Sequence, residues 1–276
     1  AHRGMITDRN GEPLAISTPV DSVWVNPRET RTGALKPDRL ARILEMDPDD
    51  LRALLRDRAG REFVYLRRQI APAQATQVAA LKLPGVYLQR EYRRYYPAGE
   101  ITAHLLGFTN VDDTGQEGVE LAYEDWMRGL PGSKRVLRDS LGRIVQDIES
   151  ITPASPGRQL TLSIDRRVQY LAYRELKRAV IEHDARGGSL VMLDVRTGEV
   201  MAMVSEPAFN PNNREKLRSD RYRNRAATDV FEPGSTMKPF SIAAALASGM
   251  FRPDTPVDAR PGTLRISNHT IRDIHD

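Results

Sequence analysis

The chain has 276 residues, of which 40% are hydrophobic and 28% are charged, and its formal net charge is +4. This composition is typical of a globular protein with about two domains and argues against a disordered chain. Cysteine is absent, which excludes disulfides, thiolate zinc sites and cysteine nucleophiles, and no run of about 18 apolar residues is long enough to span a membrane. Only six of the 41 cationic residues are Lys, and the Arg residues are dispersed among acids, so we expect no nucleic-acid partner.

The first part of the chain alternates short strands and helices. Residues 1–25 predict an edge-like β-hairpin, because Asp8-Arg9-Asn10-Gly11 is a turn sequence in which Asn-Gly favours positive φ. A Pro/Ser/Gly stretch at 151–157 predicts the boundary between a domain of residues 1–155 and one of residues 156–276. Between the hairpin and this boundary, we expect helices over 37–58, a strand over 63–66, a helix over 71–83, an extended segment over 86–96, a compact apolar segment over 103–109, a helix over 118–130 and a strand pair around 139–142.

A different order of elements is expected after residue 156. Asp165 is the predicted N-cap of a long helix, and Arg196-Thr197-Gly198 is the predicted turn of an antiparallel hairpin. The two parts together predict an α+β fold with an antiparallel sheet and helices. The elements are a strand over 160–164, the long helix to about residue 183, hairpin strands over 188–194 and 199–205, and a helix from about 235 to 248.

Ser235 and Lys238 are the candidate catalytic residues. Residues three apart on a helix share a face, with Cβ atoms about 5–6 Å apart, so the hydroxyl and the amine can meet. A serine needs a base to take its proton, and a lysine serves as that base once burial and the helix dipole lower its pKa. This is the only Ser-x-x-Lys in the chain, and Phe231-Glu232-Pro233-Gly234 forms a tight entry before it. The alternative is a structural role, because Ser is also a common helix N-cap.

The segment around Ser235 resembles the nucleophile segment of class B penicillin-binding proteins. Three other stretches resemble motifs of that family's N-terminal non-catalytic domain: residues 3–15, residues 94–99 with 104–108, and residues 115–120. A fourth, residues 197–202, resembles the hairpin of the family's penicillin-recognising domain. Asn110-Val111-Asp112-Asp113 and Phe231-Glu232-Pro233 are closer to the cell-division type than to the elongation type. The stretches run in family order over essentially the whole chain: 3–15, 94–99 with 104–108, 115–120, 197–202 and 231–240.

The resemblance implies an N-terminal dimerisation or pedestal domain followed by the first part of a penicillin-recognising serine transpeptidase domain. It implies that Ser235 attacks the D-Ala-D-Ala carbonyl of a peptidoglycan stem peptide and that the amine of a neighbouring stem displaces the acyl group. β-Lactam antibiotics would acylate the same serine. Lys238 carries over as the general base, and the backbone N–H of Ser235 as half of the oxyanion hole. Glu232 either borders the substrate or only favours the helix start. No cofactor and no metal ion is expected.

The family also implies partners and a location. The partners are divisome proteins and a lipid-linked glycan polymerase, and the location is the periplasm, where a helix upstream of residue 1 would anchor the protein in the inner membrane. The family needs a Ser-x-Asn motif and a Lys-Thr/Ser-Gly strand after the nucleophile. Neither is among residues 236–276, since Ser267-Asn268-His269 does not match. We therefore expect this chain to be a fragment that is inactive as a transpeptidase.

Other hypotheses stay open. One is a non-catalytic scaffold or interaction module of the cell-wall division machinery, and another is a β-lactam sensor or hydrolase, for which no deacylating base can be assigned. Asn110-Val111-Asp112-Asp113 with Glu117 and Glu120 lacks the spacing of a calcium loop, so a solvated turn is expected. The five His residues show no metal spacing, and His104 is expected to pack or to form a hydrogen bond. The predicted domain of residues 1–155 is called the N-terminal module below. Within it, we expect ion pairs between four arginines and three acids: Arg3, Arg9, Arg93 and Arg94 with Asp8, Glu91 and Glu100.

Overall fold

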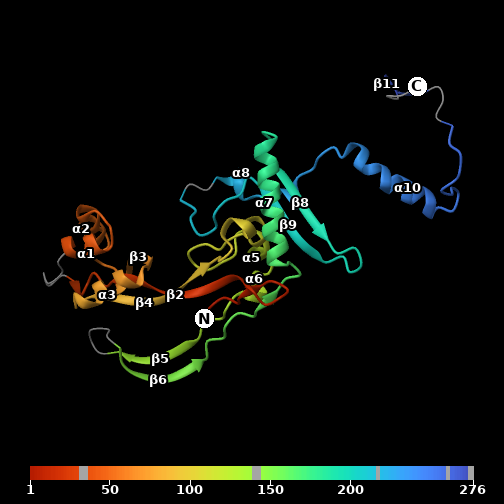
Figure 1. Ribbon diagram of the computed structural model, residues 1–276. Helices are drawn as coiled ribbons and strands as arrows, with labels where there is room; N and C mark the ends of the chain where they lie inside the picture. The colour runs from red at the N-terminus through yellow and green to blue at the C-terminus, as the bar shows by residue number, and fades with distance from the viewer. Residues whose placement is uncertain (31–36, 139–143, 216–217, 259–261, 273–276) are drawn as a thin grey trace. The chain divides into compact units, whose positions relative to one another are not determined.

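The computed structural model describes residues 1–30, 37–138, 144–215, 218–258 and 262–272 (Figure 1). The chain divides into two compact units, Ala1–Asp229 and Val230–Asp276, which are described separately below. Within the described residues, no helix is both long enough and apolar enough to cross a membrane.

The centre of the main sheet is β2 (Pro13–Val25), which pairs antiparallel with three other strands. Its start pairs with β1 (Ile6–Thr7), residues 16–25 pair with β4 (Val86–Tyr95), and its end pairs with β3 (Val64–Ile70). The predicted turn joins β1 to β2, with Gly11 at φ 85°. The predicted hairpin is confirmed by the antiparallel pairing of β1 and β2, but its predicted position at an edge is wrong, because β2 has strands on both of its sides. The strand predicted over 63–66 extends four residues beyond its predicted end.

One end of this sheet is covered by three helices. They are α1 (Pro37–Ile43), α2 (Pro48–Asp57) and α3 (Pro72–Ala80), which confirms the helices predicted there (Figure 1). Asp47 begins α2 by accepting hydrogen bonds from the main-chain N–H groups of Asp49 and Asp50, as an N-cap does. Apolar side chains from this helical region and from strands β2 and β3 pack together to form the first core: Val23, Val25, Leu40, Ala41, Leu44, Leu51, Leu66, Ile70, Ala75 and Val78.

A second core lies around the first strand. It is formed by Ile6, Leu14, Ala15, Tyr96, Leu106 and Met127. The single helix predicted over 118–130 is instead two short helices, because Tyr123 at φ −114° and ψ 28° leaves the helical region between them. The short elements here are η2 (Gly99–Thr102), α4 (Ala103–Leu106), α5 (Gly118–Ala122), α6 (Glu124–Met127) and the antiparallel pair β5 (Ser133–Arg138) and β6 (Ile144–Thr152). The turn predicted around 139–142 lies outside the described residues.

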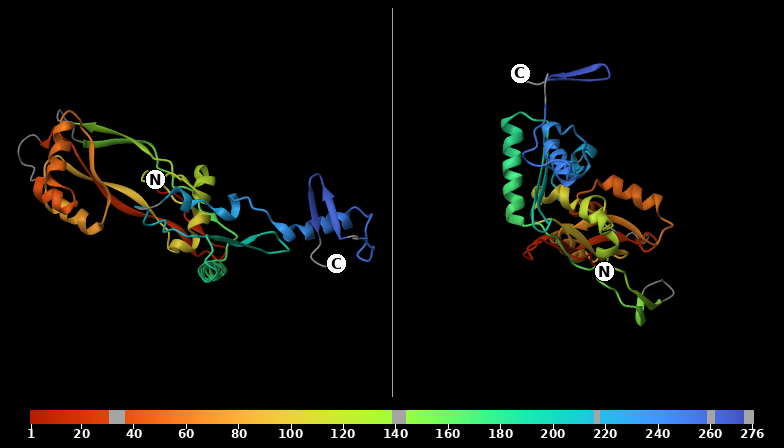
Figure 2. Two further views of the ribbon diagram at one scale, coloured as in Figure 1. Left: turned by 90° about the horizontal axis from the view of Figure 1, so that it is seen from above. Right: turned by 90° about the vertical axis from the view of Figure 1, so that its right-hand side faces the viewer.

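The chain then returns to the main sheet and builds a third core. The strand predicted over 160–164 forms only as β7 (Leu160–Thr161), parallel to β1. The long helix α7 (Arg166–Glu182) and the hairpin of β8 (Gly188–Leu193) and β9 (Val200–Glu206) confirm the elements predicted there, and Asp165 caps α7. The helix lies along the hairpin in each view (Figures 1 and 2) and buries Ala172 against Ala202 and Val204. Two short helices follow: α8 (Ser219–Tyr222) and α9 (Arg225–Thr228).

The second unit contains the predicted nucleophile. Its elements are η3 (Gly234–Met237), α10 (Lys238–Ala247), β10 (Thr263–Ile266) and β11 (His269–Arg272). The predicted helix therefore begins three residues later than expected, after a 3₁₀ turn that contains Ser235. The division of the chain near residue 155 stays a prediction.

Candidate functional site

Ser235 and Lys238 lie on successive turns at the start of the helical segment in the second unit. Gly234 at φ 56° begins the 3₁₀ turn, in a conformation that glycine adopts without steric cost. The backbone N–H of Lys238 donates to the carbonyl of Ser235, and Pro239 occupies the first turn of α10, where its missing N–H is least costly. Both side chains are exposed, and among the described residues no hydrogen bond joins them.

Glu232 is also exposed, and it has no ion pair with any residue that the structure describes. The helix α10 itself is almost entirely apolar, yet its large side chains lie on the surface, with Phe240 67% and Ile242 59% exposed. A helix that is apolar on all sides is normally buried. The surroundings of Ser235 and Lys238 therefore lack the covering that a helix of this composition usually has.

A buried ion network in the first unit joins the three motif segments of the N-terminal module. Glu120 accepts from Nε of Arg3 and from Nε of Arg94, both at 2.6 Å, and all three side chains are at most 2% exposed. Arg3 also binds Glu124 at 2.5 Å, and Arg94 donates to the carbonyl of Gly4 at 2.8 Å. Burial alone would lower the pKa of the Arg3 guanidinium, but its two carboxylate partners outweigh burial and raise that pKa.

Glycines bring the main chain of these segments close enough for the network to form. A Cβ on Gly115 would lie 2.0 Å from the carbonyl oxygen of Glu120, and one on Gly107 would lie 1.9 Å from that of Glu117. Both distances are far below van der Waals contact. Gly107 also has φ 71°, so a side chain at that position would be strained as well as crowded. These two glycines fix where Glu120 lies.

The predicted partners of the arginines are wrong. Arg3 and Arg94 bind Glu120, and Arg9 binds Glu199 at 3.0 Å across the first unit. Arg93 has no carboxylate partner among the described residues. Its guanidinium donates a hydrogen bond to the carbonyl of Asn212 at 3.5 Å. These pairings were missed because the partners lie far apart in sequence.

The three acids that were predicted to pair with these arginines have other roles. Asp8 accepts from the backbone N–H groups of Asn10, Glu12 and Arg166, and so fixes the β1–β2 turn and the start of α7. Glu91 binds Arg68 and accepts from the hydroxyls of Ser22 and Tyr65, and Glu100 binds Lys177 and Tyr173.

Gln169 ties α7 to two other elements and was missed by the sequence reasoning. Its Nε2 donates to the carbonyls of Ile101 and Met203, and its Oε1 accepts from the N–H of Met203, all at 2.8 Å. The side chain is fully buried. Gln169 precedes Ala172 by three positions and Leu176 by seven, so it lies on the apolar face of the helix. A polar residue on that face was the available signal.

His104 and the turn at 110–113 have structural contacts. A ring nitrogen of His104 lies 2.8 Å from the carbonyl of Arg221, and burial lowers the pKa of this imidazole, so the prediction of a hydrogen-bonding role is confirmed. The side-chain oxygen of Asn110 accepts from the N–H groups of Asp112 and Thr114, which closes the turn. Asp113 is largely buried, and burial raises its pKa to about 6. Within the described ranges, no group of acidic or His side chains is arranged to hold a metal ion.

Comparison with known proteins places these features in a family. The sequence model of the penicillin-binding protein dimerisation domain matches residues 1–162, and that of the penicillin-binding protein transpeptidase domain matches residues 188–276. The chain is 47% identical over 277 residues to peptidoglycan D,D-transpeptidase FtsI of Escherichia coli K12, covering 99% of this chain and 47% of that protein. It is 44% identical over 272 residues to the probable peptidoglycan D,D-transpeptidase PbpC of Pseudomonas aeruginosa, covering 99% and 48%.

More distant relatives agree. The chain is 40% identical over 279 residues to the probable peptidoglycan D,D-transpeptidase PenA of Neisseria meningitidis, covering 100% of this chain and 48% of that protein. A crystal structure of a peptidoglycan synthetase from Bifidobacterium adolescentis superimposes with a TM-score of 0.69 at 25% identity, covering all of this chain and 55% of that one. The chain thus spans about half the length of the relatives that it matches.

Proposed function

Because this chain belongs to the penicillin-binding proteins, and to the FtsI type of class B among them, we propose that it is part of a serine-type peptidoglycan D,D-transpeptidase that acts at the division septum. The observation that carries the proposal is that Ser235 lies in the 3₁₀ turn η3 and Lys238, three residues later, begins α10, in the segment that matches the transpeptidase domain. The relatives' names supply the reaction.

The proposed reaction is a double displacement at Ser235. Its Oγ bonds to the carbonyl carbon of the penultimate D-Ala of a stem peptide while Lys238 Nζ takes the hydroxyl proton. The carbon–nitrogen bond then breaks, and the terminal D-Ala leaves as an amine with that proton. The amine of a second stem attacks the ester, its proton passes through Lys238 to the departing Oγ of Ser235, and a cross-link replaces the original amide. The backbone N–H of Ser235 donates to the oxyanion in both steps.

Lys238 can take a proton only when its amine is neutral, and burial is the effect that favours the neutral form. The described residues leave Lys238 exposed and α10 uncovered. Catalysis therefore requires further protein or substrate to pack over this helix. Glu232, at the edge of the same segment, is proposed to border the substrate.

Acylation by a fluorescent penicillin tests the proposal. Two forms should be compared: the 276-residue chain, and the same chain extended by any sequence that its gene encodes after residue 276. We expect one adduct per molecule in an extended form that contains Ser-x-Asn and Lys-Thr-Gly, and none in the shorter form. Mass spectrometry should place the adduct on Ser235, and Ser235→Ala should abolish it. An adduct that persists in Ser235→Ala would refute the assignment.

The scaffold hypothesis makes a different prediction. If the protein only holds partners together, the Ser235→Ala variant should support division as well as the unaltered protein does. If the protein is a transpeptidase, the Ser235→Ala variant should fail to support division. Division should be scored by cell length in a strain depleted of its own copy, with immunoblots confirming equal amounts of both variants.

We also propose that the protein faces the periplasm, is anchored in the inner membrane, and works with divisome proteins and a lipid-linked glycan polymerase. Membrane fractionation and crosslinking in cells would test this proposal, and recovery of the gene's full product in the soluble cytoplasmic fraction would contradict it.

A further inference from the structure

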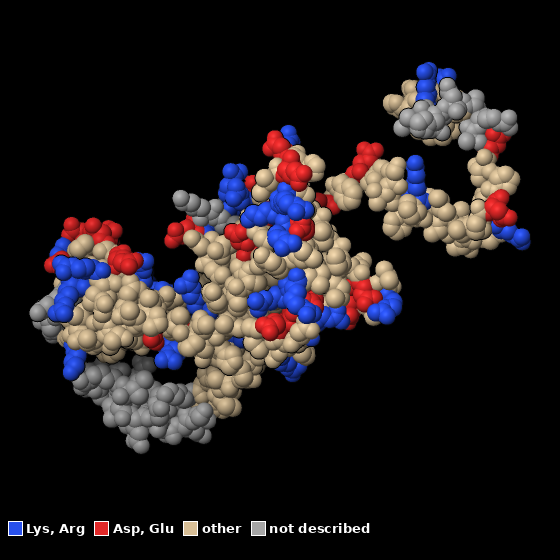
Figure 3. Space-filling model, viewed as in Figure 1, with Lys and Arg blue, Asp and Glu red and all other residues tan. Residues whose placement is uncertain are grey.

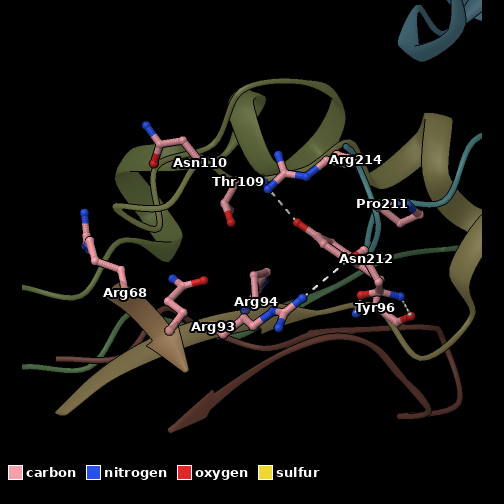
Figure 4. A pocket seen from close by; sticks show the side chains of 10 residues that line it. Arg68, Arg93, Arg94, Tyr96, Thr109, Asn110, Pro211, Asn212 and Arg214 are labelled. Atoms are coloured by element: carbon pink, nitrogen blue, oxygen red, sulfur yellow. Dashed lines mark hydrogen bonds between the residues drawn. The ribbon is translucent and has the colours of Figure 1, made fainter. Parts of the chain in front are cut away.

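A pocket of about 240 Å³ lies in the first unit between the main sheet and the segment after β9 (Figure 4). Its walls come from β3, β4, the segment before the 110–113 turn and the segment 211–214. Neither Ser235 nor Lys238 lines it. The lining residues are four arginines and six neutral residues, without a carboxylate: Arg68, Arg93, Arg94, Arg214, Gln69, Tyr96, Thr109, Asn110, Pro211 and Asn212.

Two of the four arginines are already neutralised. Arg68 binds Glu91 at 3.1 Å and Asp112 at 2.6 Å, and Arg94 binds Glu120. The other two, Arg93 and Arg214, have no ion pair with any described residue. The face seen in Figure 3 intersperses cationic with acidic side chains. What sets the pocket apart is that its lining contains arginines but no carboxylate.

Arg93 and Arg214 bring two like charges to the lining of one pocket. Partial burial, together with the like charge of Arg93, lowers the pKa of the Arg214 guanidinium. The Arg214 guanidinium also lies over the ring of Phe108, 4.6 Å from its centroid, which holds it at the pocket wall. An anion between the two guanidinium groups would relieve their repulsion.

The walls are fixed before any ligand arrives. Asn212 and Tyr96 exchange two hydrogen bonds, of 3.0 and 2.9 Å, which attach the 211–214 segment to the end of β4. Gln69 has φ 53°, an uncommon conformation for a residue with a side chain. It is held there by donations to the hydroxyl of Ser22 and to the carbonyls of Tyr92 and Val111. Binding would therefore need little ordering of the main chain.

We propose that this pocket binds a phosphate or diphosphate group. Two uncompensated arginines match a dianion, and the planar guanidinium fork suits phosphate oxygens, which it can bind in bidentate fashion. The volume of 240 Å³ equals that of about eight water molecules at ~30 Å³ each, enough for a diphosphate with some of its hydration. The group can come from a soluble phosphate compound or from a lipid headgroup, because the chemistry is the same. This site is additional to the transpeptidase reaction and does not depend on it.

Calorimetric titration of the chain with sodium diphosphate tests the proposal, with sodium chloride at equal ionic strength as the blank. We expect saturable binding with one site, weakened about tenfold by Arg93→Gln or by Arg214→Gln, since each removes a charge-assisted contact. The double variant should show no measurable binding. Arg90→Gln is the matched control: it removes the same charge from the same strand, its side chain is 67% exposed, and it does not line the pocket. Its affinity should equal that of the unaltered chain.

Further arms separate the sources and the alternatives. Flotation with phosphatidic acid vesicles against phosphatidylcholine vesicles would show whether a lipid headgroup reaches the pocket, and loss of flotation in the double variant would support that source. Arg93→Lys should bind diphosphate with intermediate affinity, because it keeps the charge and loses the fork. The proposal is overturned if diphosphate does not bind, if binding survives the double variant, or if succinate or a Glu-rich peptide binds the pocket more tightly than diphosphate.

Discussion

Glu120→Gln is the substitution that should most damage the first unit. Glu120 is fully buried and is the shared partner of Arg3 and Arg94, whose side chains are 1% and 2% exposed. Gln keeps the shape of the side chain but removes the charge. Arg3 would keep the carboxylate of Glu124, whereas Arg94 would keep only neutral acceptors, among them the carbonyl of Gly4 and the hydroxyl of Ser17 at 3.1 Å. A buried guanidinium would then lack a counter-charge.

Removal of one partner of a buried ion pair costs about 3–5 kcal/mol of unfolding free energy. A domain has about 5–15 kcal/mol in total, so the loss amounts to a large part of its stability. At a urea slope of about 2 kcal/mol per molar, the unfolding midpoint should fall by about 2 M. Tryptophan fluorescence can follow this locally, because the chain has only two Trp and Trp126 lies in α6 beside Glu124. All variants should therefore be compared in a Trp24→Phe background.

The control for charge alone is Glu199→Gln. Glu199 binds Arg9 at 3.0 Å, but the two side chains are 43% and 33% exposed. An exposed pair of this kind contributes at most about 1 kcal/mol. The reasoning is refuted if Glu120→Gln lowers the unfolding free energy by less than about 1 kcal/mol, or by no more than Glu199→Gln does.

Three further substitutions follow from buried groups. Burial raises the pKa of Asp113 from 3.8 to about 6, so the unfolding free energy should fall as the pH rises between these values, because the folded state holds the proton more tightly. Asp113→Asn should remove this fall and stabilise the protein by up to about 3 kcal/mol above pH 7. Urea unfolding at a series of pH values between about 4 and 7 would contradict this if the unfolding free energies of the two proteins changed equally with pH. Gly107→Ala should cost more than about 3 kcal/mol, because its Cβ would lie 1.9 Å from the carbonyl oxygen of Glu117, whereas Gly198→Ala, at φ 76° with no atom within 4 Å, should cost only about 1–2 kcal/mol. Equal melting temperatures for these two variants would count against the crowding. Gln169→Leu should cost about 2–4 kcal/mol, since it strands three buried main-chain groups, and a neutral effect in urea would show that they find other partners.

The helices and the second hairpin could be predicted because their signals are local. Asp47 before Pro48 and Asp165 before α7 are N-caps within one turn of the helices that they begin. Gly198 at φ 76° closes the hairpin turn that its sequence predicts. In each case the residues that decide the structure are at most a few positions apart, so their spacing is visible in the sequence.

The ion pairs and the position of β2 could not be predicted because they depend on distant residues. Arg3 and Glu120 are 117 positions apart, and no local pattern indicates that they meet. The same holds for β2, whose neighbours include strands that begin at Val64 and Val86. For the candidate site, the motif predicts the placement of Ser235 and Lys238 at a helix start, but not the 3₁₀ turn that comes first. Burial of that site depends on packing rather than on the motif.

The stretch predicted as a domain boundary is held against the N-terminal module. The N–H of Gly157 donates to the carbonyl of His2 at 2.9 Å, and a Cβ on Gly157 would lie 1.7 Å from the carbonyl oxygen of Met127. Nine residues after Gly157, the N–H of Arg166 at the start of α7 donates to Asp8. Gln169 of the same helix donates to the main-chain carbonyls of Ile101 and Met203. A flexible linker would make none of these contacts. The N-terminal module therefore fixes the orientation of α7 and of the β8–β9 hairpin, which begins the segment that matches the transpeptidase domain.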